Sequence, residues 1–299
     1  MYEQNCSPLP SGDCLDVFGD RLAEIEHLTH QARHAVDFSG AVQEANTATQ
    51  PFFARICRRL LLPGSGLVGF EHVATLARLA EQGAGCLLCL NHQSTLDVPT
   101  LYALIEDQAD LAVFHRIIWV SGRKLDEDPG VTPLLAGCFQ RIVVTPKAEL
   151  LALENEAERR ERSRLNMRTY RVMHDLRRQG WVVALFPAGT RLRPGNDASG
   201  RAIEEIDSYL KRFDYLVLGH VDGCTLPPTR DHDLSRETPR LDRIVFTFAP
   251  VVETERWRAA AALRYPGRSQ RCASAHAIMA EIAALRPENI LAGTATSQA

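Results

Sequence analysis

The chain has no run of about 18 apolar residues, the length that a helix needs to cross the apolar core of a membrane. We therefore predict no transmembrane helix and limit any membrane contact to peripheral association. No N-terminal apolar stretch resembles a signal peptide, and the eight cysteines are scattered along the chain. These features favour a cytoplasmic protein whose thiols stay reduced.

An excess of positive charge is also missing. The formal net charge is −3, from 34 lysines and arginines against 37 acidic residues. A dedicated nucleic-acid binder is usually basic, so we predict no nucleic-acid partner. The apolar and charged fractions, 45% and 24%, are those of an ordinary globular protein. A chain of 299 residues can form one large domain or a large domain and a small one.

Several signals of enzyme chemistry are absent. The sequence has no G-x-S-x-G elbow, which disfavours a serine hydrolase. Cys86 and Cys89 have the spacing of a metal-binding pair, but strand residues three apart face opposite sides, which favours two core cysteines. His27, His30 and His34 share a predicted helical face without a fourth ligand in view. We therefore predict neither a metal site nor another cofactor.

The order of apolar segments predicts a small N-terminal helical domain, residues 1–65, and an α/β domain, residues 66–299. The turn-forming segment Pro63-Gly-Ser-Gly66 sets the boundary. Beyond it, short apolar runs alternate with helical patterns, which predicts a mixed, largely parallel sheet flanked by helices. The longest predicted helix spans residues 146–178. The predicted strands are residues 86–90, 112–120, 139–144, 181–186 and 244–252.

The most informative stretch is Asn91-His-Gln-Ser-Thr-Leu-Asp97, at the turn from a predicted buried strand to a helix. A histidine held by a carboxylate can remove a proton from an alcohol near neutral pH, so His92 and Asp97 are candidate catalytic residues. A purely local interpretation is also available, because Ser94 and Asp97 have the spacing of a helix capping box. The position after a buried strand favours the catalytic interpretation.

A second motif, Phe186-Pro-Ala-Gly-Thr-Arg191-Leu-Arg193, follows another predicted strand. A tight turn at a strand end exposes backbone N–H groups, and two arginines at alternate positions can bind one phosphate group. The alternative is a surface turn with solvated arginines, which gives no reason for two arginines at this point.

Further basic residues follow other predicted strands. Lys147 stands at a predicted helix start, where a positive charge opposes the helix dipole, and this indicates an anionic ligand. Arg141, inside the preceding predicted strand, is the alternative basic residue for binding this anionic ligand. Arg123 and Lys124, which follow the predicted strand ending at Val120, are additional candidates.

Together these motifs resemble the glycerolipid acyltransferase family, which is marked by an H-x4-D motif and a later F-P-x-G-T-R motif. Asn91–Asp97 fits the first motif. Phe186–Arg191 fits the second, except that most members carry glutamate where this chain has Ala188. The soluble, plastid-type glycerol-3-phosphate acyltransferases also lack that glutamate and resemble this chain more closely. The resemblance covers roughly residues 66–285.

The resemblance implies transfer of a fatty acyl group from an acyl-carrier protein or coenzyme A thioester to the 1-hydroxyl of glycerol 3-phosphate, in phospholipid biosynthesis. Three alternatives remain open: acylation of 1-acylglycerol 3-phosphate at its 2-hydroxyl, thioester hydrolysis by water, and a non-catalytic module that binds a carrier protein or lipid. In the implied enzyme, His92 and Asp97 are catalytic, Arg191, Arg193 and Lys147 hold the phosphate, and Arg141, Gly189 and Thr190 are further substrate-binding candidates.

Overall fold

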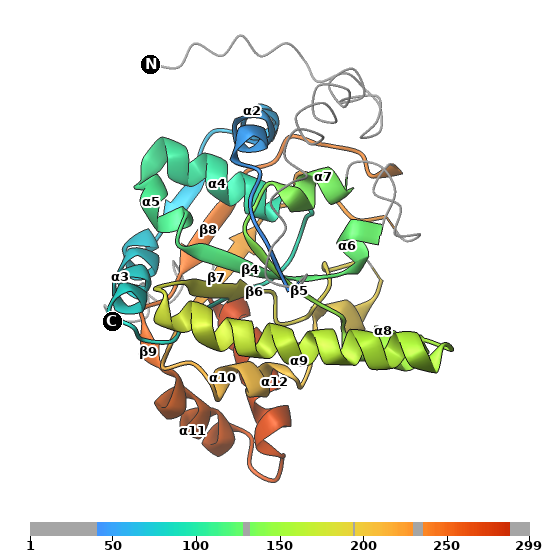
Figure 1. Cartoon of the computed structure of the whole chain (residues 1–299). Helices are drawn as coiled ribbons and strands as arrows, with labels where there is room; N and C mark the ends of the chain where they lie inside the picture. The colour runs from blue at the N-terminus through green and yellow to red at the C-terminus, as the bar shows by residue number, and fades with distance from the viewer. Residues whose placement is uncertain (1–40, 128–131, 194, 230–235, 288–299) are drawn as a thin grey trace, which may run out of the picture.

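The computed structural model describes residues 41–127, 132–193, 195–229 and 236–287. They form one nine-stranded sheet with helices on both faces (Figure 1). The strand order is β1-β5-β4-β6-β3-β7-β8-β2, and β9 pairs with β7. The strands are β1 (Val42–Gln43), β2 (Gly66–Val68), β3 (Cys86–Leu90), β4 (Ile117–Gly122), β5 (Arg141–Val144), β6 (Val182–Leu185), β7 (Tyr215–Asp222), β8 (Val245–Phe248) and β9 (Val252–Glu253).

The five strands from β5 to β7 in this order run parallel, which confirms the predicted α/β class. Antiparallel pairs lie toward the edges, where β1 joins β5 and β8 joins β7. The parallel centre matters for function, because the carboxyl ends of parallel strands meet at one edge of the sheet.

Helices cover the sheet in two layers (Figure 1). One layer contains α2 (Gln50–Leu60), α3 (Phe70–Glu81), α4 (Asp97–Gln108) and α5 (Leu111–Phe114). The opposite layer contains α9 (Glu156–Arg178), α10 (Ile206–Leu210), α11 (Thr254–Arg264) and α12 (Gln270–Ala284). Three short helices lie at strand ends: α6 (Lys124–Glu127), α7 (Thr132–Gly137) and α8 (Lys147–Ala152).

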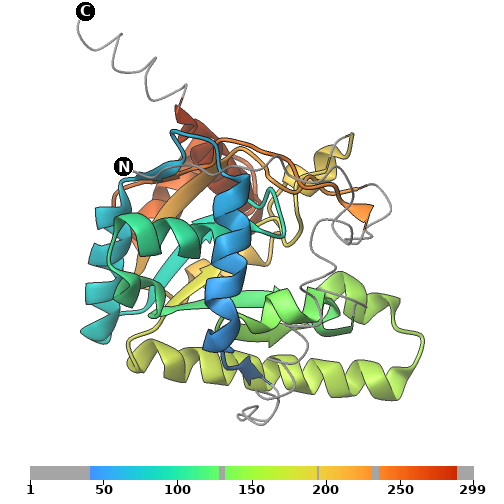
Figure 2. The same cartoon turned by 90° about the horizontal axis from the view of Figure 1, so that it is seen from above.

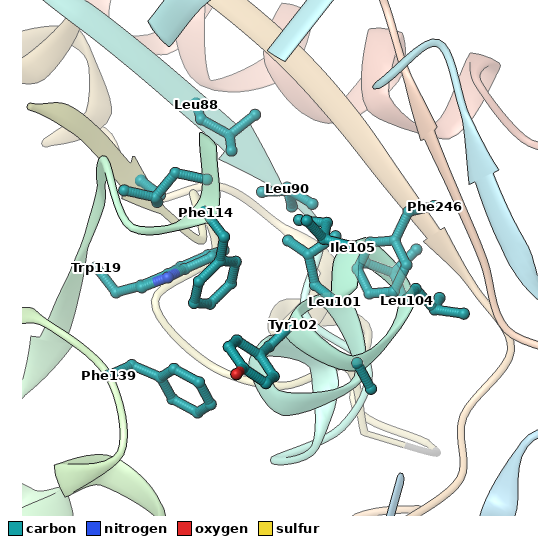
Figure 3. Close-up of a cluster of buried hydrophobic side chains, with 14 of the residues drawn as sticks. Leu88, Leu90, Leu101, Tyr102, Leu104, Ile105, Phe114, Trp119, Phe139 and Phe246 are labelled. Carbon is teal, nitrogen blue, oxygen red and sulfur yellow. The ribbon is translucent and has the colours of Figure 1, made fainter. Parts of the chain in front are cut away.

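Strand β3 explains why the core has two halves. All five of its residues are buried, and alternate side chains enter opposite clusters, as the pleat of a strand requires. Leu88 and Leu90 pack toward Trp119, Phe114 and other aromatic side chains beneath α4 (Figure 3). Cys86 and Cys89 are free thiols in the core, as predicted, and burial raises the pKa of Cys86 to about 12.

Three predicted elements differ from the structure. The predicted strand 244–252 is divided into β8 and β9 by residues 249–251. The predicted strand 112–120 begins with helix α5, and only its second half belongs to β4. The predicted long helix 146–178 is divided into α8 and α9, because Asn155 accepts hydrogen bonds from the Ala157 and Glu158 N–H groups and caps a new helix.

Residues 1–40 lie outside the described residues, and so do His27, His30 and His34. A separate N-terminal helical domain therefore stays a prediction. Residues 41–60 pack on the α/β core: β1 extends the sheet, and α2 lies over it and packs against α4 (Figure 2). None of the helices in the described part of the chain has the length and apolar content of a membrane span.

Candidate active site

The two predicted motifs meet at one edge of the sheet. Strands β3 and β6 are parallel neighbours, with Cys89 paired to Leu185, so both motifs leave the sheet at the same edge. The Leu192 N–H donates to the His92 carbonyl oxygen at 2.7 Å, which joins the two loops directly. The parallel register of β3 and β6 brings the two loops to the same edge of the sheet.

His92 and Asp97 form a close pair. The His92 Nδ1 lies 2.8 Å from Asp97 Oδ2, and the Asp97 side chain is only 5% exposed. A carboxylate facing Nδ1 favours the tautomer with hydrogen on Nδ1, which leaves the Nε2 lone pair available to accept a proton. Asp97 is also the first residue of α4, where the helix dipole favours its negative charge.

Asp97 also makes local contacts within this motif. The same Asp97 Oδ2 accepts the Gln93 and Ser94 N–H groups at 2.7 and 3.0 Å. The Ser94 Oγ accepts the Leu96 N–H at 3.0 Å. One carboxylate thus holds the turn before α4 and faces the His92 ring, so the same contacts rigidify the turn and the pair.

Aromatic side chains fix the plane of the His92 ring. Phe186 stacks on it with ring centroids 3.9 Å apart and an interplanar angle of 8°. Trp119 stacks behind Phe186 at 5.6 Å and is itself almost fully buried. These stacked rings cover one face of the His92 imidazole. Phe186, the first residue after β6, thereby contacts the candidate base directly.

Asn91 anchors the loop on its other side. Its Oδ1 accepts the Val221 N–H at 2.7 Å, and its Nδ2 donates to the Val221 carbonyl at 2.9 Å. Sequence reasoning assigned Asn91 no role, although a polar residue directly after a buried strand is a signal that could have indicated one. The His92 backbone is therefore held by both β7 and the second motif.

The second motif forms a tight turn. Gly189 has a φ of +66°, a conformation that favours glycine, and its N–H donates to the Phe186 carbonyl at 2.9 Å. That N–H is already used within the turn, so substrate contacts by Gly189 and Thr190 stay predictions. The Ile203 N–H donates to the Pro187 carbonyl and holds the turn from the far side.

Arg191 binds a carboxylate that sequence reasoning missed. Its Nη1 lies 2.7 and 2.6 Å from the two carboxylate oxygens of Glu237, in the connection between β7 and β8. Glu237 is fully buried and the Arg191 side chain is 13% exposed. Burial raises the pKa of Glu237, and the Arg191 charge opposes that shift. Glu237 lies 46 residues beyond Arg191, so no local spacing could have linked them.

Arg193 is the second arginine of the motif. Burial lowers the pKa of its guanidinium, and the neighbouring Arg191 charge lowers it further. Its backbone N–H donates to Ser199 Oγ at 2.8 Å. Two arginine side chains two residues apart concentrate positive charge at this turn, which suits an anionic ligand.

Residues 71–213 match the family model described as Acyltransferase. This segment is similar to acyltransferase domains. It contains both motifs and supports an acyltransferase enzyme of lipid biosynthesis, in agreement with the predicted resemblance to glycerolipid acyltransferases at the family level. A search of curated proteins found no match. The matched segment contains His92, Asp97 and both motif arginines, whereas Glu237 comes from the chain beyond it.

Two other predicted basic residues of the matched segment, Lys147 and Arg141, belong to or follow β5, which is not adjacent to β6. Lys147 begins α8, after β5, which is two strand positions from β6, or roughly 10 Å. Its Nζ lies 3.7 Å from Glu205, and its side chain is 68% exposed. Arg141 is buried in β5 and bonds to Gln43, Asp126 and Ser121. Its substrate contact stays a prediction.

Arg123 is a further cation at this edge. It follows β4, the immediate neighbour of β6, and its backbone N–H donates to the Val144 carbonyl at 2.9 Å. Among the described residues, no hydrogen-bond partner faces its buried Nε. An unsatisfied buried donor directly after the strand next to β6 makes Arg123 a stronger candidate than its sequence position alone indicates.

Proposed function

We propose that this chain is a glycerol-3-phosphate 1-O-acyltransferase, with an acyl thioester of coenzyme A or acyl-carrier protein as donor. The observation that carries the proposal is the bond between Leu192 and the His92 backbone. It attaches the loop bearing Arg191 and Arg193 to the candidate base. A phosphate bound by these arginines would hold a hydroxyl of the same small molecule near the imidazole.

The proposed reaction uses His92 as general base. Its Nε2 accepts the acceptor's hydroxyl proton while that oxygen attacks the thioester carbonyl carbon. The tetrahedral intermediate then collapses: the C–S bond breaks, and the imidazolium returns the proton to the leaving thiolate. Asp97 stabilises the imidazolium between these steps and keeps the ring in the productive tautomer. A general base of this kind contributes about 10²–10⁴-fold in rate.

Phosphate binding supplies the second part of the catalysis. In the proposal, Arg191 and Arg193 bind the phosphate, with Lys147 approaching from α8. Fixing the acceptor hydroxyl against the base can lower the barrier by up to roughly 7–11 kcal/mol. The arginines should therefore affect the rate almost as strongly as His92 does.

The proposal is tested by measuring thiol release from palmitoyl-coenzyme A and palmitoyl-acyl-carrier protein. Purified protein is assayed without an acceptor, with glycerol 3-phosphate and with glycerol. We expect release to depend on glycerol 3-phosphate, and 1-acylglycerol 3-phosphate to form in equal amount. Release at the same rate without an acceptor would instead establish a thioesterase, and binding of donors without release would establish a non-catalytic module.

One observation favours a second acceptor, 1-acylglycerol 3-phosphate. Two apolar side chains at the second motif are exposed: Leu192 (41% exposed), within the motif, and Ile203 (44% exposed), whose N–H donates to the Pro187 carbonyl. They suit an acceptor that carries its own acyl chain and could rest on a membrane surface. The same assay with this lysolipid decides between the acceptors: we expect a higher kcat/KM for glycerol 3-phosphate, and the reverse order would identify the 2-hydroxyl activity.

A further inference from the structure

We infer that Glu237 is a positioning residue, which holds the Arg191 guanidinium in the orientation that binds the acceptor phosphate. This inference rests on the proposed function, because it gives the arginine a phosphate to bind. Glu237 lies outside the matched acyltransferase segment, so the inference extends the site into the β7–β8 connection.

The geometry of the pair supports a positioning role. Both carboxylate oxygens of Glu237 approach a single nitrogen of Arg191, Nη1, at 2.7 and 2.6 Å. A guanidinium has five N–H donors in a rigid plane, so fixing Nη1 also fixes the direction of Nε and Nη2. Glu237 is fully buried, which leaves its carboxylate little freedom to turn away.

The charges of Arg191 and Arg193 repel one another, and the Glu237 carboxylate reduces this repulsion. Arg191 and Arg193 are two residues apart, and the charge of Arg191 contributes to the lowered pKa of Arg193. Ala188, within the same turn, provides no carboxylate. Glu237 offsets this repulsion through its ion pair with Arg191, and a bound phosphate would add further negative charge beside both arginines. Without Glu237, a nearly buried Arg191 would turn toward water, because an unpaired buried charge is strongly unfavourable.

The loss of Glu237 would also reach His92 through the backbone. Leu192, directly after Arg191, donates its N–H to the His92 carbonyl. Displacement of Arg191 would therefore loosen the contact between the second motif and His92. The main effect of losing Glu237 should still fall on acceptor binding, because Asn91 and Asp97 hold the His92 loop independently.

The test uses the full-length protein with Glu237→Gln and Glu237→Asp. We expect Glu237→Gln to raise the KM for glycerol 3-phosphate and to weaken its binding in calorimetry by roughly 10- to 100-fold, the effect of losing one charge-assisted hydrogen-bond pair. Glu237→Asp keeps the charge on a shorter side chain, so its KM should lie between that of the wild type and that of Glu237→Gln.

Two comparisons separate positioning from simple destabilisation. In a double-mutant cycle, Glu237→Gln with Arg191→Ala should raise KM no further than Arg191→Ala alone, because both remove one interaction. Asp207→Asn is the matched control: Asp207 is a buried carboxylate 2.8 Å from Arg258, between α10 and α11. It should lower Tm and leave the acceptor KM unchanged.

The outcomes distinguish the two proposals. Additive losses in the cycle, or a Glu237→Gln protein that loses Tm like Asp207→Asn with normal acceptor binding, would overturn the positioning role alone. A wild-type protein that neither binds nor acylates glycerol 3-phosphate would overturn the proposed function together with it.

Discussion

Asp97 allows the charge and the geometry of the candidate pair to be separated. The Gln93 N–H, the Ser94 N–H and His92 Nδ1 all converge on one oxygen, Oδ2, at 2.7, 3.0 and 2.8 Å. In an Asp97→Asn protein the single amide oxygen can occupy this position and accept all three bonds. The substitution then keeps the tautomer of His92 and removes only the negative charge.

The expected magnitudes follow from these contacts. Replacing a charge-assisted hydrogen bond to the imidazolium by a neutral one costs about 1.4–2 kcal/mol, so kcat of Asp97→Asn should fall by roughly 10- to 30-fold. Asp97→Ala also loses the orientation of His92 and the hydrogen bonds to the turn before α4. Its kcat should fall by about 10²–10⁴-fold, the full contribution of a general base.

The assay is acceptor-dependent thiol release at saturating glycerol 3-phosphate, with Tm measured for each variant. Ser94→Ala is the matched control, because the Ser94 Oγ accepts the Leu96 N–H within the turn and, among the described residues, makes no hydrogen bond to His92 or Asp97. It should lower Tm and leave kcat unchanged. Equal losses in the Asn and Ala variants would show that the amide presents its NH₂ group to Nδ1, and full activity in Asp97→Asn would show that its charge is irrelevant; either result refutes the reasoning.

Three further predictions follow from single sites. His92→Ala should abolish acyl transfer with Tm within a few degrees of the wild type, and appreciable turnover would exclude it as the base. Arg123→Ala should raise the acceptor KM about tenfold, whereas Arg116→Ala, at the other end of β4, should not; equal KM values would remove Arg123 from the phosphate site. Burial and the Arg286 charge lower the pKa of buried His220, so the unfolded state binds more protons below about pH 6.5. Urea unfolding should therefore give a stability that decreases from about pH 7 to pH 5, and His220→Leu should flatten that slope; an unchanged slope would assign it to other groups.

The sequence was sufficient for parts of the site that are built from neighbouring residues. Strand β3 and the His92–Asp97 pair involve a continuous apolar run and a contact across five positions. Such features leave a local pattern, because a buried strand must be apolar and a cap must stand at a fixed distance from the helix start. The strand before the second motif was predictable for the same reason.

Features that depend on distant contacts were not predictable. Strand β7 was missed because Gly219 and His220 interrupt its apolar run. The structure explains the glycine: a Cβ at Gly219 would lie 2.9 Å from the Phe248 ring and 3.2 Å from Leu90. Glu237 lies in a segment without secondary-structure periodicity, and only the folded chain shows that it faces Arg191.

The site combines rigid and adaptable parts, and the contacts show which is which. His92 is held through its own backbone, its Nδ1 and its ring face, so the base is preorganised before any substrate binds. Lys147 is different: its ion pair with Glu205 is 3.7 Å long and largely exposed, and such pairs contribute little to stability. Lys147 can therefore leave Glu205 for a phosphate at small cost. Binding would then move the lysine toward the acceptor, while the arginines and the base stay where the fold has placed them.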